Sequence, residues 1–140
     1  MTGPLTLHAS CVAVQGRGVL ILGPSGAGKS GLALQLMGFG AQLVADDRTI
    51  LRREGDGLLA TCPPALAGMI EARGIGILNA RPLAQAGVAL VVDLGQPETD
   101  RLPPPRTITL LGLEVDLVLQ SQNDHFAAAV LLYLAAGRRA

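Results

Sequence analysis

The chain has 140 residues, and its 11 basic side chains balance 11 acidic ones, so the formal net charge is zero. This length fits one domain, over residues 1–140, and is too short for two ordinary ones. Because the arginines are scattered and aromatic residues make up only 2% of the chain, the composition indicates neither a basic nucleic-acid surface nor a base-stacking platform.

Two apolar segments near the N-terminus predict neighbouring strands. Residues 5–14 run or alternate apolar, and glycines follow them at once, which is typical of a strand that turns tightly into the next one at 19–22. His8 and Ser10 would lie on one face of the first strand. A lone histidine on such an apolar strand is as often a buried core residue as a catalytic one.

Residues 23–30 form a complete phosphate-binding loop between that second strand and a helix-like segment at 32–37. In order they are Gly23, Pro24, Ser25, Gly26, Ala27, Gly28, Lys29 and Ser30. The glycines let backbone N–H groups turn toward phosphates, Lys29 reaches the β and γ oxygens, and the Ser30 hydroxyl is placed to ligate Mg²⁺. Lys29 is also the only lysine, which favours a site that needs a compact ammonium rather than a guanidinium. We expect ATP and Mg²⁺ as ligands; the alternative is an adventitious glycine-rich turn.

Two carboxylates end the next apolar strand, at 43–45. Asp46 and Asp47 follow it directly, in the position where nucleotide hydrolases and kinases hold Mg²⁺ or orient a nucleophile. Neighbouring strand residues point to opposite faces, so the two acids are expected to do different work. The alternative is that one of them caps a turn or pairs with Arg48.

The rest of the chain predicts short strands and a final helix. The expected strands and hairpins are 49–51 with 58–61, 75–78, 88–94, and 107–111 with 113–119. Pro63-Pro64 opens a segment that we expect to be helical to about residue 73. The proline-rich residues 95–105 are expected to form a mobile surface loop. Ser121 or Asn123 can cap a last helix that ends near Gly137.

Cysteine use and hydropathy indicate a cytoplasmic protein. Cys11 and Cys62 are far apart and lack the spacing of a zinc site or a disulfide framework. No basic segment followed by a long apolar one begins the chain, and the most apolar helix-like run, 127–136, is too short for a membrane span. We therefore expect reduced thiols and no membrane partner.

Several motifs in one order resemble the catalytic domain of bacterial HPr kinase/phosphorylase. They are His8 in a strand, the Gly-x-Ser-Gly-x-Gly-Lys-Ser loop, Leu-Val-Ala-Asp-Asp-Arg, and Glu-Ala-Arg-Gly-Ile-Gly-Ile-Leu at 71–78. The likeness runs from about Leu7 through Leu102. It implies an α/β P-loop kinase domain of the phosphoenolpyruvate carboxykinase-like type, with a mixed sheet and flanking helices. It also implies an ATP-dependent kinase for a serine of HPr, the phosphocarrier of the sugar phosphotransferase system, and we expect a homo-oligomer.

The resemblance further implies a role for each matching residue. By this resemblance, His8 is the catalytic histidine, Asp47 the proton acceptor and Asp46 a supporting acid. Lys29 is the loop lysine, and Ser30 and Glu71 are metal ligands. Arg101 is a loop arginine, and the signature loop includes Arg73, Gly74 and Gly76. From the residues alone, Glu71 could instead lie in an ordinary helix C-terminus. Arg101 could equally be a solvated loop arginine.

Two departures from the family pattern matter for function. Its usual members carry an additional N-terminal domain, whereas this chain starts almost at the first catalytic strand, so we expect a minimal form. The family's Arg-Pro-Gly-Arg stretch, associated with dephosphorylation, is replaced by Leu-Gln-Ser-Gln-Asn at 119–123, so phosphorylase activity is expected to be weak or absent. The competing interpretations are a small-molecule kinase or simple nucleotide hydrolase, and a regulatory module that senses ATP without turnover.

Overall fold

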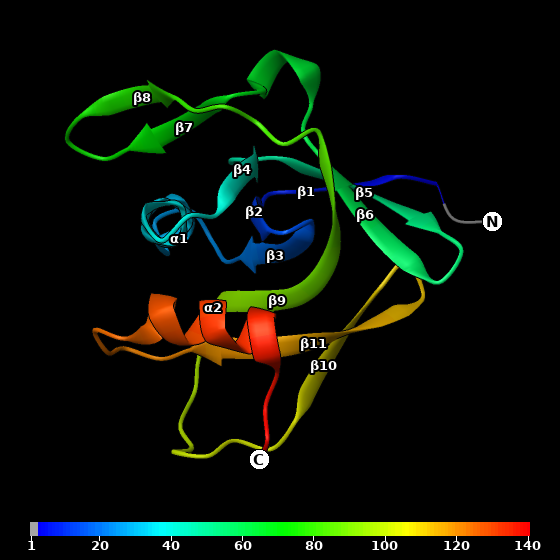
Figure 1. Ribbon diagram of the computed structural model, residues 1–140, viewed down its shortest axis with the longest axis vertical. Helices are drawn as coiled ribbons and strands as arrows, with labels where there is room; N and C mark the ends of the chain where they lie inside the picture. Colours follow the sequence, from blue (N-terminus) through cyan, green and yellow to red (C-terminus); the bar gives the residue numbers. More distant parts are fainter. Residues whose placement is uncertain (1–2) are drawn as a thin grey trace.

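Nine strands pair into one mixed sheet, and two more form a separate hairpin (Figure 1). The computed structural model describes residues 3–140. The elements are β1 (Leu5–Leu7), β2 (Ser10–Val14), β3 (Arg17–Leu22), α1 (Lys29–Gly38), β4 (Gln42–Ala45), β5 (Thr49–Glu54), β6 (Gly57–Thr61), the 3₁₀ turn η1 (Pro64–Leu66), β7 (Met69–Ala72), β8 (Gly76–Asn79), β9 (Gln85–Pro97), β10 (Arg106–Leu110), β11 (Leu113–Gln120) and α2 (Phe126–Ala136). The expected α/β class, with a mixed sheet and flanking helices, is confirmed.

The long strand β9 organises the sheet. Its first residues pair antiparallel with β6, while the remainder lies parallel to β3 on one side and to β11 on the other. Val91 is thus in register with Leu20 of β3 and with Leu117 of β11. Since β3, β9 and β11 run parallel, their carboxyl ends meet at one edge of the sheet, which is where α/β proteins commonly bind ligands.

Alternating side chains give the sheet an apolar core on each face. Val19 and Ile21 of β3 pack toward the helices, whereas Leu20 between them packs into the second core with Val91 and Leu51. This alternation is the period of two that a strand imposes. Both cores consist mainly of Leu, Val, Ile and Ala, because the chain has very few aromatic residues.

Helix α1 lies between the β7–β8 hairpin and α2 (Figure 1). It buries Leu32, Ala33 and Leu36 against the sheet and ends near Gly40, whose φ of 107° is a left-handed conformation that glycine adopts without strain. Neither helix in residues 3–140 is long and apolar enough to cross a membrane.

The predicted helix from Pro63 to residue 73 is wrong. Only a short 3₁₀ turn forms there, and the chain then reverses at Gly68 and continues as strand β7. An added Cβ at Gly68 would lie 3.0 Å from the Ala80 carbonyl oxygen, so the two segments approach too closely for another residue. In β7, Ile70 and Ala72 are buried and Glu71 between them is exposed, which is strand periodicity.

Smaller differences concern element ends. The predicted strand at 5–14 is interrupted at a bend at His8, and β9 continues to Pro97, so the loop expected from residue 95 begins later. Neither Ser121 nor Asn123 is the N-cap of α2; that residue is His125, whose N–H donates to Asn123 Oδ1. The expected end of this helix near Gly137 and both predicted hairpins are confirmed.

Candidate functional site

A glycine-rich loop, residues 23–30, joins β3 to α1. Gly23, Gly26 and Gly28 have φ values of 150°, 84° and 99°, which residues with a Cβ rarely adopt. Gly28 is the N-cap of α1 and makes no side-chain cap, so the first N–H groups of the helix remain available to a ligand. A loop of this kind presents several backbone donors to an anion.

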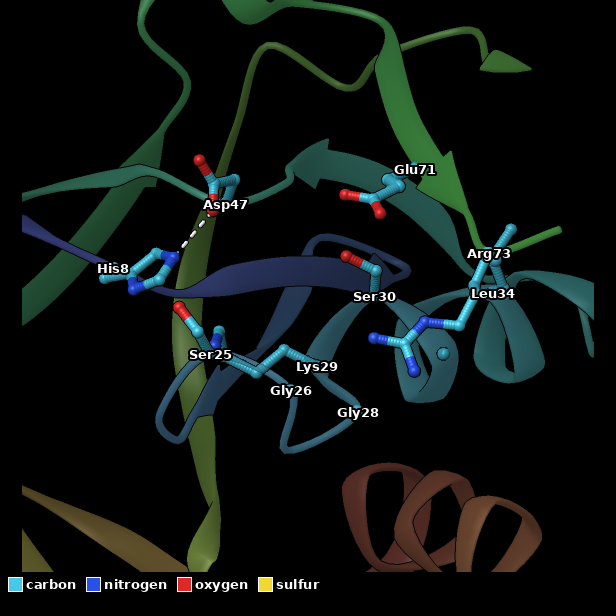
Figure 2. A pocket seen from close by; sticks show the side chains of 11 residues that line it. His8, Ser25, Gly26, Gly28, Lys29, Ser30, Leu34, Asp47, Glu71 and Arg73 are labelled. Atoms are coloured by element: carbon cyan, nitrogen blue, oxygen red, sulfur yellow. Dashed lines mark hydrogen bonds and ion pairs between the residues drawn. The ribbon is translucent and has the colours of Figure 1, made fainter. Parts of the chain in front are cut away.

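The loop forms one wall of a cavity of about 350 Å³ (Figure 2). The lining residues come from four separate segments: His8; Ser25, Gly26, Gly28, Lys29, Ser30, Gly31 and Leu34; Asp47; and Glu71 and Arg73. The structure therefore brings together most of the residues that the sequence analysis selected. The volume lies near the lower end of the roughly 300–1,000 Å³ typical of small-molecule sites.

Asp46 does not line the cavity but connects three segments next to it. Its Oδ1 accepts hydrogen bonds from the Ser10 and Ser30 hydroxyls, both at 2.7 Å, and its Oδ2 accepts one from the Glu71 backbone N–H at 3.1 Å. The side chain is only 7% exposed. Burial of a carboxylate is costly unless donors surround it, and these three donors satisfy that need.

Asp47 faces a different partner. Its Oδ1 lies 2.6 Å from His8 Nε2, and both side chains are exposed. The two adjacent acids thus have separate hydrogen-bond partners, which agrees with the expectation that they have different roles. His8 lies in the bend between β1 and β2 with 41% of its side chain exposed, so it is not a buried core histidine.

Lys29 is 7% exposed and points back over the loop. Its Nζ donates hydrogen bonds to the carbonyl oxygens of Gly23 at 2.8 Å and Pro24 at 3.1 Å. These contacts hold the ammonium against the backbone of the loop.

Glu71 and Arg73 reach the cavity from the opposite side. Glu71 lies on β7, and Arg73 follows in the turn that Gly74 and Gly76 make possible with φ values of 87° and 142°. Figure 2 shows both side chains directed toward the loop and the start of α1. The alternative placement of Glu71 at a helix C-terminus is wrong, because this segment is a strand.

Arg101 does not line this cavity. It lies in an exposed bend after β9, beside a smaller cavity of about 140 Å³. The base of that loop is anchored by Arg106, whose Nε and Nη2 donate to the two carboxylate oxygens of Glu98, each at 3.0 Å. These bonds hold the pKa of Glu98 below its ordinary value. The catalytic role of Arg101 stays a prediction.

Ser10 is the residue that sequence reasoning undervalued. It is fully buried, and its hydroxyl donates to Asp46, which directly follows the neighbouring strand β4. The signal was present, since a serine between Ala9 and Cys11 in an apolar strand must be buried and must find a hydrogen-bond partner.

Oxygen groups dominate the part of the site that could hold a cation. The Ser30 hydroxyl and the carboxylates of Asp46 and Glu71 belong to neighbouring segments, and hard divalent cations prefer such ligands. Within residues 3–140, no three His, Cys, Asp or Glu side chains are grouped closely enough to form a metal site by themselves.

Comparisons with known proteins agree on one family. Residues 1–100 match the family model described as HPr Serine kinase C-terminal domain. The chain is 37% identical over 120 residues to HPr kinase/phosphorylase 1 of Oceanobacillus iheyensis, and this match covers 80% of the chain and 37% of the relative. It is 40% identical over 120 residues to HPr kinase/phosphorylase of Geobacillus kaustophilus, with the same coverages.

A solved structure has the same architecture. The Hpr(Ser) kinase/phosphatase from Coxiella burnetii superposes with a TM-score of 0.75 at 29% sequence identity, covering 90% of this chain and 91% of that one. The chain spans little more than a third of the length of the two curated relatives, at 37% of each.

Proposed function

The chain belongs to the HPr serine kinase C-terminal domain family, and from this premise we propose that it is an ATP-dependent kinase that phosphorylates a serine of HPr. HPr is the phosphocarrier of the sugar phosphotransferase system, so the reaction would regulate carbon metabolism. The observation that carries the proposal is the Asp47–His8 pair, which faces the same cavity as Lys29 and the glycine-rich loop.

The loop is proposed to bind the triphosphate of ATP. Backbone N–H groups at the start of α1 would cradle the phosphates, and Lys29 would exchange its two carbonyl contacts for the β and γ oxygens. The ammonium is already within the loop, so little rearrangement is needed. This arrangement supports the P-loop kinase assignment, and the phosphoenolpyruvate carboxykinase-like type is part of the same proposal.

Ser30 and Glu71 are the proposed ligands of Mg²⁺. Their oxygens fit this cation, which is usually held by one or two protein carboxylates together with substrate phosphates rather than by an all-protein cage. When bound, Mg²⁺ neutralises charge on the transferring phosphoryl group. Asp46 supports both ligands, through the hydroxyl of Ser30 and the backbone N–H of Glu71.

Asp47 is the proposed proton acceptor. The bond from the acceptor serine Oγ to the γ-phosphorus forms while the bond from that phosphorus to the β–γ bridging oxygen breaks, and the hydroxyl proton passes to the Asp47 carboxylate. His8 fixes the orientation of that carboxylate through their 2.6 Å contact. Both side chains are exposed, which leaves room for an acceptor on a second protein.

We further propose that the reverse activity is weak, because the residues before α2 are Gln120 to Asn123 rather than an arginine-rich stretch. Inorganic phosphate added to phosphoseryl-HPr should release little pyrophosphate, and rapid release would contradict this. A cytoplasmic location agrees with the two free thiols, Cys11 and Cys62. Self-association into a homo-oligomer is also part of the proposal.

Mass spectrometry of HPr after incubation with the chain, labelled ATP and Mg²⁺ tests the function. Label on one serine supports it, and HPr with that serine replaced by alanine is the control substrate. Hydrolysis of ATP without labelled HPr would favour a simple nucleotide hydrolase or a small-molecule kinase. ATP binding without any turnover would favour a nucleotide-sensing module.

A further inference from the structure

The backbone at Asp47 has an unusual conformation. Its φ is 70°, in the left-handed region that residues with a Cβ seldom adopt. The Arg48 N–H donates to the Asp46 carbonyl oxygen at 2.8 Å, which closes a three-residue γ-turn with Asp47 at its centre. A γ-turn of this hand is rare because it strains the chain, and it persists only where the surrounding structure holds it. The neighbours of the turn therefore determine where the Asp47 carboxylate lies.

Two fully buried hydroxyl groups, those of Ser10 and Thr49, hold the two ends of this turn. Ser10 Oγ donates to Asp46 Oδ1 at 2.7 Å and accepts a longer hydrogen bond, of 3.5 Å, from the Asp47 N–H. Thr49 Oγ1 donates to the Ala9 carbonyl oxygen at 2.9 Å. The turn is thus fastened on both sides of Asp47 to two consecutive residues of the N-terminal segment.

The same two segments carry the His8–Asp47 pair. His8 directly precedes Ala9, and its Nε2 lies 2.6 Å from Asp47 Oδ1. Both side chains of the pair are exposed, so water competes for their contact, whereas the bonds of Ser10 and Thr49 are shielded from it. On the basis of the proposed role of Asp47 as proton acceptor, we propose that Ser10 and Thr49 are positioning residues that hold its carboxylate beside His8 at the cavity.

The strand that leads into the turn makes this support necessary. The register between β2 and β4 shifts between Cys11 and Val12, so β4 carries one extra residue just before the two acids. Such a bulge changes the direction of the side chains that follow it and is common next to active sites. After a bulge and a strained turn, strand geometry alone no longer fixes the direction of Asp47, and the two buried hydroxyls supply the missing constraint.

Packing does not account for either hydroxyl. An alanine at position 10 or a valine at position 49 would place no polar atom in a fully buried position, where an unpaired hydroxyl is costly. Thr49 therefore offers a matched pair of variants. Thr49→Val keeps the shape of the side chain and removes the hydroxyl, while Thr49→Ser keeps the hydroxyl.

Steady-state kinetics with HPr tests the positioning role. Thr49→Val and Ser10→Ala should each lower kcat about tenfold and leave Mg·ATP affinity within twofold of wild type, because a misplaced proton acceptor affects the rate rather than binding. Thr49→Ser should keep kcat within threefold of wild type. The control is Thr107→Val, the same exchange at an exposed position of β10, which should change neither quantity.

Three kinetic outcomes would overturn the proposal. The first is an unchanged kcat in Thr49→Val or in Ser10→Ala, which removes the role of that residue. The second is an equal loss of kcat in Thr49→Ser and Thr49→Val, since the hydroxyl would then not matter. The third is a loss of Mg·ATP affinity as large as the loss of kcat, which would indicate a loosened metal site.

A double-mutant cycle separates positioning of Asp47 from a general loosening of the fold. Ser10→Ala in the Asp47→Asn background should change kcat less than twofold, because no carboxylate remains to be positioned. Single-turnover measurements give the rate of this slow background. The same tenfold loss in both backgrounds would show that Ser10 acts elsewhere and would contradict the proposal.

Hydrogen exchange of the Arg48 amide, followed by NMR, reports on the turn without HPr or ATP. Its rate should rise about tenfold in Ser10→Ala and Thr49→Val and stay unchanged in Thr107→Val. If the wild type labels no HPr but both variants speed this exchange, only the kinase function fails. If HPr is labelled and both variants keep wild-type kcat and exchange, only the positioning role fails.

Discussion

The Ser30 hydroxyl donates a 2.7 Å hydrogen bond to Asp46 Oδ1, and this bond joins the first turn of α1 to the end of β4. The same oxygen accepts from Ser10, and the other carboxylate oxygen accepts from the Glu71 N–H. One buried carboxylate therefore fixes the positions of three segments that surround the candidate site.

Asp46→Asn should destabilise the fold and weaken Mg·ATP binding. The amide keeps one acceptor oxygen and replaces the other with a donor, so at least one of the three donors loses its partner. We expect a loss of about 1–3 kcal/mol in the free energy of unfolding, measured by urea denaturation. Asp56→Asn, in the exposed β5–β6 turn, is the control. An unchanged urea midpoint for Asp46→Asn would contradict the anchoring role.

Asp47→Asn should separate binding from chemistry. The side chain is exposed, and within residues 3–140 its carboxylate makes a hydrogen bond only with His8. Removal of the carboxylate charge should therefore leave the fold and the Mg·ATP affinity nearly intact. Removal of the proton acceptor should lower kcat by roughly 10²–10⁴. Steady-state kinetics with HPr measures this. If Asp46→Asn lost kcat at normal affinity and Asp47→Asn did not, the roles of the two acids would be reversed.

Lys29→Arg should abolish phosphoryl transfer and weaken ATP binding, even though the charge is kept. The ammonium occupies a buried position against two carbonyl oxygens, and a guanidinium is wider, planar and different in its donor geometry. ATP affinity and turnover are the measurements. The control is Arg17→Lys, the reverse exchange at an exposed position of β3, and this variant should behave as wild type. Near-normal turnover of Lys29→Arg would remove the proposed role.

Arg101→Ala should lower kcat more than it weakens ATP binding. The residue lies outside the cavity in this structure, so any contact with the transferring phosphoryl group must form when the loop closes over the substrates. Interactions made mainly in the transition state appear in the rate rather than in ground-state affinity. Arg52→Ala on β5 is the control. An unchanged kcat would make Arg101 an ordinary solvated arginine.

Glu98→Gln should reduce stability at neutral pH and alter its dependence on acid. The hydrogen bonds from Arg106 lower the pKa of Glu98 in the folded chain, so its contribution is complete above the unfolded pKa of about 4.5. That contribution is lost as the pH falls through the lower folded pKa. Urea denaturation at pH 7 and pH 3 should therefore show a difference between wild type and variant that shrinks in acid. Glu114→Gln, an exposed control on β11, should show no such difference.

Local patterns predicted the parts of the site that depend on neighbouring residues. The glycine-rich loop needs only its own glycines and the flanking strand and helix, and the acids follow directly from strand β4. The segment 63–73 was mispredicted because its prolines and short apolar run fit a helix as well as a strand. Pairing of Ile70 with Leu78, and the close approach of Gly68 to Ala80, decide the outcome.

The position of Arg101 could not be predicted for a related reason. Its loop is set by the Glu98–Arg106 pair and by the Glu98 N–H, which donates to the Gln120 carbonyl oxygen at 2.7 Å. These contacts join β9, β10 and β11, and no local sequence pattern reveals them. The three-way contact of Asp46 likewise depends on segments that meet only in the folded chain.

The double pairing of β9 has a consequence for how the chain folds. Its partners β3 and β6 precede it in sequence and β11 follows it, so none of the central parallel pairs can form until Gln85–Pro97 has left the ribosome. Such distant pairings close slowly, whereas the local β5–β6 and β10–β11 hairpins can form early. Backbone amides near Val91 are paired with strands on both sides, so they should be among the last to exchange with deuterium. Because the glycine-rich loop follows β3, the capacity to bind a nucleotide should arise in the same late folding step that forms these central pairs.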